Sequence, residues 1–550
     1  MALSELEKQR QENIKRNKEL LRKLQLDSFT DDITKEVAKA EPKKRKPTTE
    51  RKPRKREADQ PVRKSRRLAG VKTENTEEYA RLQAEQEEEE RKRKEMERLK
   101  QTRLFGDFKL IDLITDKRGK VKDEADIDDD DRNRIQQVLD RVGDRISCGD
   151  FHSEIRDCKV LSDKDLEAKR REFDKLHIYQ KFDPLSIKIT PNRVHSIAFH
   201  PSTTNRLVIA GDTTGSVGIW SVDDTTERQG KGDVEEVEPA ITLFKPHGKS
   251  VSKIVVSETH PSDVYTASYD GSIRKFDLHK QKSVDVAYVY DPWEDNAEDW
   301  PLGVSDINWC HDNPHVLYLT TLEGNFYRFD TREEFKLEAN QLLRCHDKKI
   351  GSFAVNPRVG YQIATASLDR SMRVWDLRNV GQCHWSEFAE QKSPHLYGGF
   401  TSRLSVSCVD WNHDNRLVFN GYDDKIHLAH LDGANDWSKT YTIGNGNANP
   451  KTAEDLPLDT IKPYETIRHN CQTGRWVSIL KSKWQQRPAD GVEKFIIANM
   501  NRGFDIYDQQ GRILAHLNED VGAVPAVCTM HPTHNWAVGG SANGKAYFFE

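Results

Sequence analysis

The chain has 550 residues, of which only 35% are hydrophobic and 32% are charged, so a sizeable part of it should lie outside any packed core. Residues 1–150 carry 40 Lys and Arg against 35 Asp and Glu, which leaves 46 against 55 for the remainder, so the basic excess belongs to the N-terminal region. The eight cysteines fall singly without metal-ligand spacing, and there is neither a secretory signal nor an apolar run that could span a bilayer. We therefore expect no structural zinc, no disulfide framework and no membrane segment, and an intracellular location.

The first predicted element is a short helix over residues 1–26. Ser4 and Glu7 form a capping box at its start, in which each side chain satisfies a backbone N–H that the helix leaves unpaired. Its apolar positions are few and are interrupted by many charges, so its apolar face is thin. The pattern fits a solvated helix, and a short docking helix for a partner is the alternative.

Residues 27–75 form a basic tail that we expect to be disordered. Between residues 43 and 68 it has 13 basic and 3 acidic residues, with prolines that prevent a continuous helix. Such a run attracts nucleic acid with little sequence preference, and its first cluster has the form of a nuclear-import signal, which predicts a nuclear protein. A merely solubilising charge run is the alternative. The two clusters consist of Lys43, Lys44, Arg45, Lys46, Arg63, Lys64, Arg66 and Arg67.

Residues 76–175 are expected to form a charged linker, partly helical and partly disordered. Residues 76–103 are rich first in Glu and then in Lys and Arg, so side-chain pairs four residues apart would stabilise a single charged helix there. Shorter helices are predicted over residues 132–142 and 163–176. These features favour a spacer over a coiled coil.

Seven similar segments then follow, each with a small-residue strand, a polar turn and an alternating apolar strand. Their turns are spaced by 56, 53, 46, 54, 78 and 42 residues, mostly longer than the roughly 40 to 45 residues of a minimal WD repeat. Several repeats must therefore carry insertions, the largest over about residues 432–475. The pattern predicts an all-β, seven-bladed WD-repeat β-propeller over residues 176–550, with repeats from about residue 193. The turns are marked by Thr214, Asp270, Glu323, Asp369, Asp423, Asn501 and Asn543.

The clearest repeat runs from His346 to Arg378. In the family pattern His346, Ser367, Asp369 and Trp375 are positioned for a hydrogen-bonded relay that ties the loop before a blade to its inner strands. These polar residues therefore have a structural explanation and are not read as a catalytic set. The chain has no P-loop, nucleophile elbow, zincin or kinase signature, so we predict that it is not an enzyme and needs no cofactor or metal.

The last repeat ends the chain at its third strand, so its fourth strand must come from elsewhere. Residues 185–190 alternate apolar and polar side chains just before the first repeat and are the natural donor. Closure of the ring by both chain ends would also remove exposed sheet edges.

Three tracts carry a family resemblance. The stretch from Ile467 to Trp476, the N-terminal EKQRQENIKRNKELLRKL and the sequence IKITPNRVHSIAFHP resemble the family of WD repeat-containing protein 76 and the fungal DNA damage-binding protein of the changed-mutation-rate type. More distantly, the chain resembles the propeller subunit of the UV-damaged-DNA-binding complex. The resemblance implies a nuclear, chromatin-associated protein that binds DNA and favours damaged or modified DNA, such as UV lesions or modified cytosine. Residues 217–221 and 427–431 depart from the family pattern because they lack its Trp-Asp ending.

The loops give an independent argument for DNA as the partner. In a WD-type blade the loop before the first strand and the turn between the second and third strands open onto the same face. Cations gathered there would bind phosphates, while Tyr269, Phe400 and Tyr422 could stack on an unpaired base. The alternative is that polar loops collect Lys and Arg in any protein. The candidate DNA-binding residues are Arg193, Lys249, Lys348, Lys349, Arg403 and Arg475 in the first set and Arg370, Lys425, Arg502 and Lys545 in the second.

The opposite face carries a second signal. Two consecutive blades end their third strands in Asp-x-Arg, as Asp330 with Arg332 and Asp376 with Arg378. This tandem pattern resembles the docking box of propellers that serve as substrate receptors on cullin-type ubiquitin ligases, in which the arginines face the adaptor. The alternative is that each arginine pairs with a carboxylate of the propeller itself.

The leading hypothesis is thus a DNA-binding module, and the alternative is a receptor that recruits protein substrates to a ubiquitin ligase. A third possibility is an interaction scaffold in chromatin without direct DNA binding, since propellers present binding faces far more often than catalytic sites.

Overall fold

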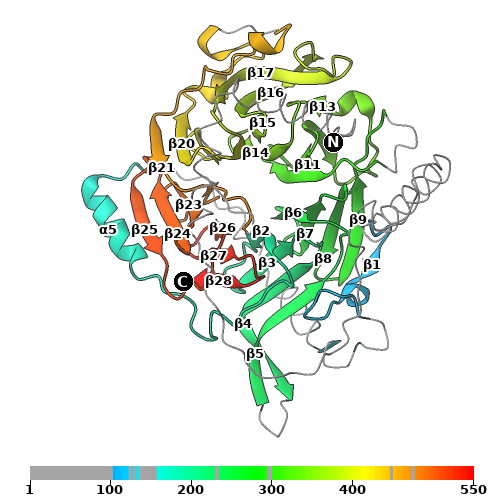
Figure 1. Cartoon of the computed structure of the whole chain (residues 1–550), viewed down its shortest axis with the longest axis vertical. Helices are drawn as coiled ribbons and strands as arrows, with labels where there is room; N and C mark the ends of the chain where they lie inside the picture. Colours follow the sequence, from blue (N-terminus) through cyan, green and yellow to red (C-terminus); the bar gives the residue numbers. More distant parts are fainter. Residues whose placement is uncertain are drawn as a thin grey trace, which may run out of the picture. The chain divides into compact units, whose positions relative to one another are not determined.

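The computed structural model of the chain describes residues 103–122, 158–229, 235–293, 300–445, 450–471 and 477–550, together with residues 127, 132, 133 and 136 (Figure 1). The expected helix of residues 1–26, both basic clusters of the tail and Arg475 lie outside these residues. Within them the chain folds almost entirely as β-strands, and the all-β prediction is confirmed. No helix in these segments has the length and apolar character needed to cross a bilayer.

The described strands form six hydrogen-bonded sheets that correspond to seven blades, because one eight-stranded sheet contains two blades. Blade 1 consists of β2 (Val194–Phe199), β3 (Leu207–Asp212), β4 (Val217–Gln229) and β5 (Glu235–Phe244). Blade 2 consists of β6 (Val251–Val256), β7 (Asp263–Ser268), β8 (Ser272–Asp277) and β9 (Lys282–Tyr288). Blade 3 consists of β10 (Val304–Cys310), β11 (Asn313–Thr321), β12 (Asn325–Asp330) and β13 (Leu343–Arg344). Blade 4 consists of β14 (Ile350–Asn356), β15 (Val359–Ser367), β16 (Ser371–Gln382) and β17 (Lys392–Thr401).

Blades 5 to 7 complete the set. Blade 5 consists of β18 (Val406–Trp411), β19 (Arg416–Gly421), β20 (Lys425–His430) and β21 (Glu465–Arg468). Blade 6 consists of β22 (Lys483–Trp484), β23 (Lys494–Asn499), β24 (Gly503–Asp508) and β25 (Ile513–Leu517). Blade 7 consists of β26 (Val527–Met530), β27 (Ala537–Gly540) and β28 (Ala546–Phe549). All seven turn markers found in the sequence fall between the second and third strands of a blade.

The first strands of the blades form a closed ring. They contact one another in order from β2 through β6, β10, β14, β18 and β22 to β26, and β26 contacts β2 again. Apolar side chains pack between neighbouring blades, as where Trp220 of blade 1 meets Phe548 of blade 7. No blade could bury both faces of its sheet alone, so the ring is the unit that buries the core.

Blade 7 is completed by residues that precede blade 1. Ile178 forms an antiparallel bridge to Phe549 of β28, and Lys188 forms one to Lys545, directly before that strand. Around them the N–H groups of Ile189 and Thr190 donate to the carbonyl of Gly544, at 2.8 and 3.1 Å. Chain segments from both sides of the repeats thus supply one blade, which removes two sheet edges.

Two segments assigned from the sequence to the linker pack against the propeller instead. β1 (Phe108–Lys109) pairs with β9 as a fifth strand, and the 3-10 helix η1 (Leu110–Leu113) follows it. Leu110 and Ile114 are buried among side chains of blades 1 and 2. The linker expectation rested on overall charge, whereas this short segment packs through its few apolar residues.

The predicted helix over residues 163–176 is observed as α5 (Asp163–Phe173), which lies beside β25 (Figure 1). Its N-cap Ser162 accepts a hydrogen bond from the N–H of Asp165. Leu166 and Phe173 are buried against blade 6, and Lys169 forms an ion pair with Asp490 at 2.8 Å.

The long connection in blade 5 joins β20 to β21 and carries the short 3-10 helices η6 (Ala434–Asp436), η7 (Ile443–Asn445) and η8 (Ala453–Asp455). It covers the outer strand of blade 4, where the N–H of Ile461 donates to the carbonyl of Gly399 at 2.9 Å. Blades 3 and 4 are further joined by a parallel pairing of β13 with β17. The insertion therefore protects an outer sheet edge.

Candidate nucleic-acid interface

One face of the ring is formed by the loops before the first strands and by the turns between second and third strands. We call this the upper face, and the other the lower face. Because successive strands of a blade are antiparallel, both kinds of segment meet at the same end of the sheet. The two are also hydrogen-bonded together: Thr213 N–H donates to the Arg193 carbonyl at 3.1 Å, and Leu368 N–H to the Lys349 carbonyl at 3.0 Å.

Nine of the ten cations predicted from the sequence are described, and all nine lie in these upper-face segments. None of the nine forms an ion pair with a carboxylate in the part of the chain that the structure describes. Lys349 donates instead to the hydroxyl of Tyr269 at 3.1 Å. Five are exposed (Lys348, Arg370, Arg403, Lys425 and Arg502) and four are partly buried (Arg193, Lys249, Lys349 and Lys545).

Two of these arginines stand in an unusual backbone conformation. In blade 1 the turn before the third strand contains Gly215, with φ 93°, and a Cβ there would lie 2.0 Å from the carbonyl oxygen of His247. Blades 4 and 6 place Arg370 and Arg502 at the equivalent position, with φ of 74° and 68°. Side chains rarely adopt this left-handed conformation, which costs about 1 kcal/mol or more. Both arginines are nevertheless present and exposed on the upper face.

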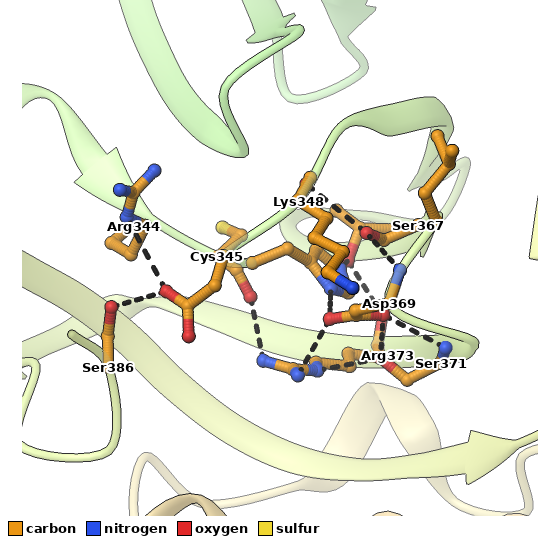
Figure 2. A network of polar contacts seen from close by, with 12 residues as sticks. Arg344, Cys345, Lys348, Ser367, Asp369, Ser371, Arg373 and Ser386 are labelled. Atoms are coloured by element: carbon orange, nitrogen blue, oxygen red, sulfur yellow. Dashed lines mark hydrogen bonds and ion pairs between the residues drawn. The ribbon is translucent and has the colours of Figure 1, made fainter. Parts of the chain in front are cut away.

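The acidic residues of the same turns are occupied by other partners. Figure 2 shows Asp369 between Ser371 and Arg373, from which it accepts hydrogen bonds of 2.6 and 2.9 Å. Its other partner is Nδ1 of His346, at 2.7 Å. Burial raises the pKa of Asp369, but His346 and Arg373 together lower it well below its usual value. Asp369 is therefore not available to neutralise Lys348 or Arg370.

Blade 2 repeats this arrangement, whereas blade 5 uses a histidine of its third strand. His247 lies 3.7 Å from Asp270 in blade 2, and His427 lies 3.0 Å from Asp423 in blade 5. Burial alone would raise the pKa of Asp270, but its hydrogen bonds and His247 lower it. The histidines thus hold several upper-face carboxylates in place.

The relay of blade 4 differs in one member from the sequence prediction. Trp375 Nε1 donates to Thr365 Oγ1 at 2.8 Å, and Thr365 Oγ1 lies 2.7 Å from Nε2 of His346. Ser367 instead donates to the carbonyl of Lys348 at 3.2 Å. The hydroxyl of the relay is therefore Thr365, because Ser367 lies at the end of β15, where its side chain meets the loop.

Two further upper-face cations were missed by sequence reasoning. Arg468 lies directly opposite Lys425 in the pairing of β20 with β21, and Lys188 lies opposite Lys545. Both additional residues are exposed, and neither has a carboxylate partner among the described residues. Like charges directly opposite on paired strands destabilise a sheet, which makes the two pairs unfavourable without an anion. Lys188 stands between the apolar Ile187 and Ile189, and this alternation could have indicated that its side chain points outward. No sequence signal placed Arg468.

The candidate aromatic residues have different environments. Tyr269 is partly buried, with Lys349 4.7 Å above its ring and His195 packed edge to face at 5.3 Å. Phe400 packs on Phe419 at 5.0 Å, so its ring belongs to the core. Tyr269 is therefore a better candidate for a base contact than Phe400.

On the lower face both predicted docking arginines pair with carboxylates of their own strands. Arg378 donates to both carboxylate oxygens of the buried Asp376 and also to the Trp437 carbonyl at 3.0 Å. Arg332 pairs with Asp330, whose pKa falls to about 2 because the guanidinium donates hydrogen bonds to it. The side chain of Arg332 is 60% exposed, compared with 26% for Arg378. Adaptor docking stays a prediction, for which Arg332 is the more accessible residue.

Comparison with known proteins places this architecture in a family. The model of the WD domain, G-beta repeat, matches residues 338–376. The DNA damage-binding proteins CMR1 of Candida albicans and Meyerozyma guilliermondii are each 52% identical to the chain, and both alignments cover the whole of both proteins. The chain belongs to the CMR1 family. The Neurospora crassa CMR1 protein, at 35% identity, still aligns with 99% of the chain and 97% of its own length. The resemblance to the fungal family is confirmed over the N-terminal region as well as the propeller.

Proposed function

We propose that this CMR1-family chain binds DNA through its upper face and favours damaged or modified DNA, in a nuclear, chromatin-associated role. The observation that carries the proposal is the set of upper-face cations without carboxylate partners. The names of the relatives, DNA damage-binding proteins, support it. UV lesions and modified cytosine are the modifications we would test first.

The physical argument concerns charge compensation. Residues 151–550 carry more acidic than basic residues, yet eleven cations on one face have no carboxylate partner among the described residues, and the nearby Asp369 is bound by His346 and a backbone N–H group. Phosphate oxygens would supply the missing partners, and the release of condensed counterions would drive association. Contacts of this kind position a protein on DNA without reading its sequence.

The direct test is a triple charge reversal on the upper face, Arg370→Glu, Arg403→Glu and Lys425→Glu. We expect duplex affinity to fall by about a hundredfold. The slope of log affinity against log salt should become shallower by roughly three, because three phosphate contacts are lost. The matched control reverses three exposed cations away from this face, Lys282→Glu, Lys439→Glu and Lys462→Glu. Equal losses in the two triple variants would show that net charge, and not the upper face, governs binding.

The basic tail adds a non-specific component. Deletion of its clusters at residues 43–46 and 63–67 should weaken binding to all DNAs alike. The salt dependence of the affinity should also become shallower. Preference is measured separately, by competition of undamaged, UV-irradiated and cytosine-modified duplexes for the full chain. An unchanged preference after tail deletion would assign the preference to the propeller.

A receptor for a cullin-type ubiquitin ligase is the second candidate function, and the exposure of Arg332 favours it. The test is co-purification of the ligase adaptor with the chain and with Arg332→Ala. If neither adaptor binding nor salt-dependent DNA affinity is detected, a chromatin scaffold remains the better description.

A further inference from the structure

The ring of first strands encloses a central channel of about 460 Å³. Residues from every blade line it, and His195 at the start of β2 marks its upper end. Arg487, which pairs with Glu258 at 3.2 Å, lies towards its lower end. The volume is far larger than the roughly 30 Å³ of one water molecule, so the channel can hold a small organic group.

The upper part of this channel contains more positive than negative charge. Lys253 lies 3.2 Å from Asp306, and Lys483 lies 4.0 Å from Asp410. Lys481 has no carboxylate partner among the described residues, and its ammonium donates only to the carbonyl of Gly351, at 3.1 Å. Three ammonium groups therefore face two carboxylates.

Backbone donors already occupy part of the acceptor capacity of both carboxylates. Asp306 accepts from the N–H groups of Ile307 and Phe353, at 2.9 and 3.3 Å. Asp410 accepts from Trp484 N–H at 2.8 Å. An ammonium group has three donors, so Lys481 retains two that no described protein acceptor fills.

The surroundings make this charge costly. Burial lowers the pKa of Lys481 to about 8, and the neighbouring Lys483 and Lys253 lower it further. Asp306 and Cys408 oppose this shift. An anion bound beside the ammonium would raise the pKa again. Anion binding near pH 8 would thus be accompanied by proton uptake.

The channel is connected to the upper face by a short series of contacts. Lys349 from blade 4 donates to Tyr269 of blade 2, and the Tyr269 hydroxyl lies 3.4 Å from Nε2 of His195. His195 is held neutral, because burial and the nearby charges of Lys481 and Lys349 lower its pKa to about 4. An aromatic ring, a cation and a neutral imidazole therefore stand at the mouth above the lysines.

We propose that the upper part of the central channel is a binding site for a phosphate group carried by a nucleotide. Lys481 is the principal contact, Lys253 and Lys483 assist it, and Tyr269 stacks on the base at the mouth. The phosphate comes either from a free nucleotide or from the end of a DNA strand. The site is separate from the exposed cations of the proposed duplex-binding surface.

The first experiment measures thermal unfolding and calorimetric binding of the full chain with inorganic phosphate, pyrophosphate and deoxyadenosine monophosphate at constant ionic strength. The wild type should gain Tm with ligand concentration and take up protons at pH 8. In Lys481→Met the affinity should fall at least tenfold and the proton uptake should vanish. In the matched variant Lys439→Met, which removes an exposed lysine outside both the channel and the upper face, both should persist.

The unliganded variants guard against a folding artefact. Removing an uncompensated charge should leave the Tm of Lys481→Met equal to or above that of the wild type. An absent phosphate response in the wild type, or an undiminished response in a folded Lys481→Met, would overturn the proposal.

The second experiment separates the two sources of the phosphate. Short single strands with a 5′-phosphate or a 5′-hydroxyl are compared with the free nucleotide. A gain from the 5′-phosphate identifies a strand end, and tight binding of the nucleotide without that gain identifies a free ligand. The triple upper-face variant should lose duplex affinity yet keep the phosphate response, so the two proposals fail independently.

Discussion

The two faces of the propeller use similar cations in opposite ways. On the lower face, Arg332 and Arg378 are neutralised by the aspartates two residues before them. On the upper face, the nine described candidate cations, Lys188 and Arg468 have no carboxylate partner among the described residues, and two pairs of them face each other across neighbouring strands. An arginine already held by its own carboxylate stabilises the fold, whereas one without a partner is available to an external anion.

This difference arises from where the nearby carboxylates are directed. Asp376 reaches Arg378 because the two lie two residues apart at an irregularity of β16, and Tyr397 and the Trp437 carbonyl complete the site. Asp369 is equally close to cations but is directed to His346 and Arg373 within its blade. A count of charges on each face would not reveal this contrast.

The largest effect on stability is expected for Asp376→Ala. The substitution leaves the Arg378 guanidinium partly buried without its carboxylate, which should cost about 3 kcal/mol of unfolding free energy. The upper-face variant Arg403→Ala should change stability by about 0.5 kcal/mol or less. Denaturant unfolding of both variants measures the difference. Similar losses in the two would contradict the contrast between the faces.

A smaller loss of unfolding free energy, of about 2 kcal/mol at pH 7, is expected for Asp369→Asn. Because the folded-state pKa of Asp369 is lowered, its stabilisation is fully present above the usual carboxyl pKa and is lost as the pH falls below about 4. The wild-type advantage should therefore shrink between pH 7 and pH 3. Urea midpoints at the two pH values test this, and a pH-independent difference would argue against ionic stabilisation.

Arg370→Gly should raise the unfolding free energy by about 0.5 to 1 kcal/mol. Glycine adopts the left-handed conformation at this position without strain, so the variant should be more stable than the wild type. Its duplex affinity should fall because a cation is lost. If the variant is less stable than the wild type and binds DNA equally tightly, Arg370 does not belong to the proposed interface.

The smallest effect is expected for Arg332→Ala, which should leave both melting temperature and DNA affinity unchanged. Its side chain is largely exposed and contacts Asp330 on the face opposite the proposed DNA site. The same protein sample can be assayed for adaptor binding. Loss of DNA affinity in this variant would mean that the two faces are not independent.

The sequence by itself determined the architecture and the position of most candidate residues. Small-residue strands, polar turns and alternating apolar strands are local patterns, so they located all seven turns between second and third strands. The antiparallel order within a blade then placed residues such as Arg193 and Arg370 on one face before any contact was known.

Only the tertiary structure decided which of these residues have partners. The register of β20 with β21 placed Arg468 opposite Lys425 across a long insertion, and strand-end geometry selected Thr365 over Ser367 for the relay. The channel gathers Lys253 and Lys481 from strands and loops more than two hundred positions apart. Charge compensation and burial depend on contacts across blades, and a local sequence pattern carries no information about such contacts until the ring is closed.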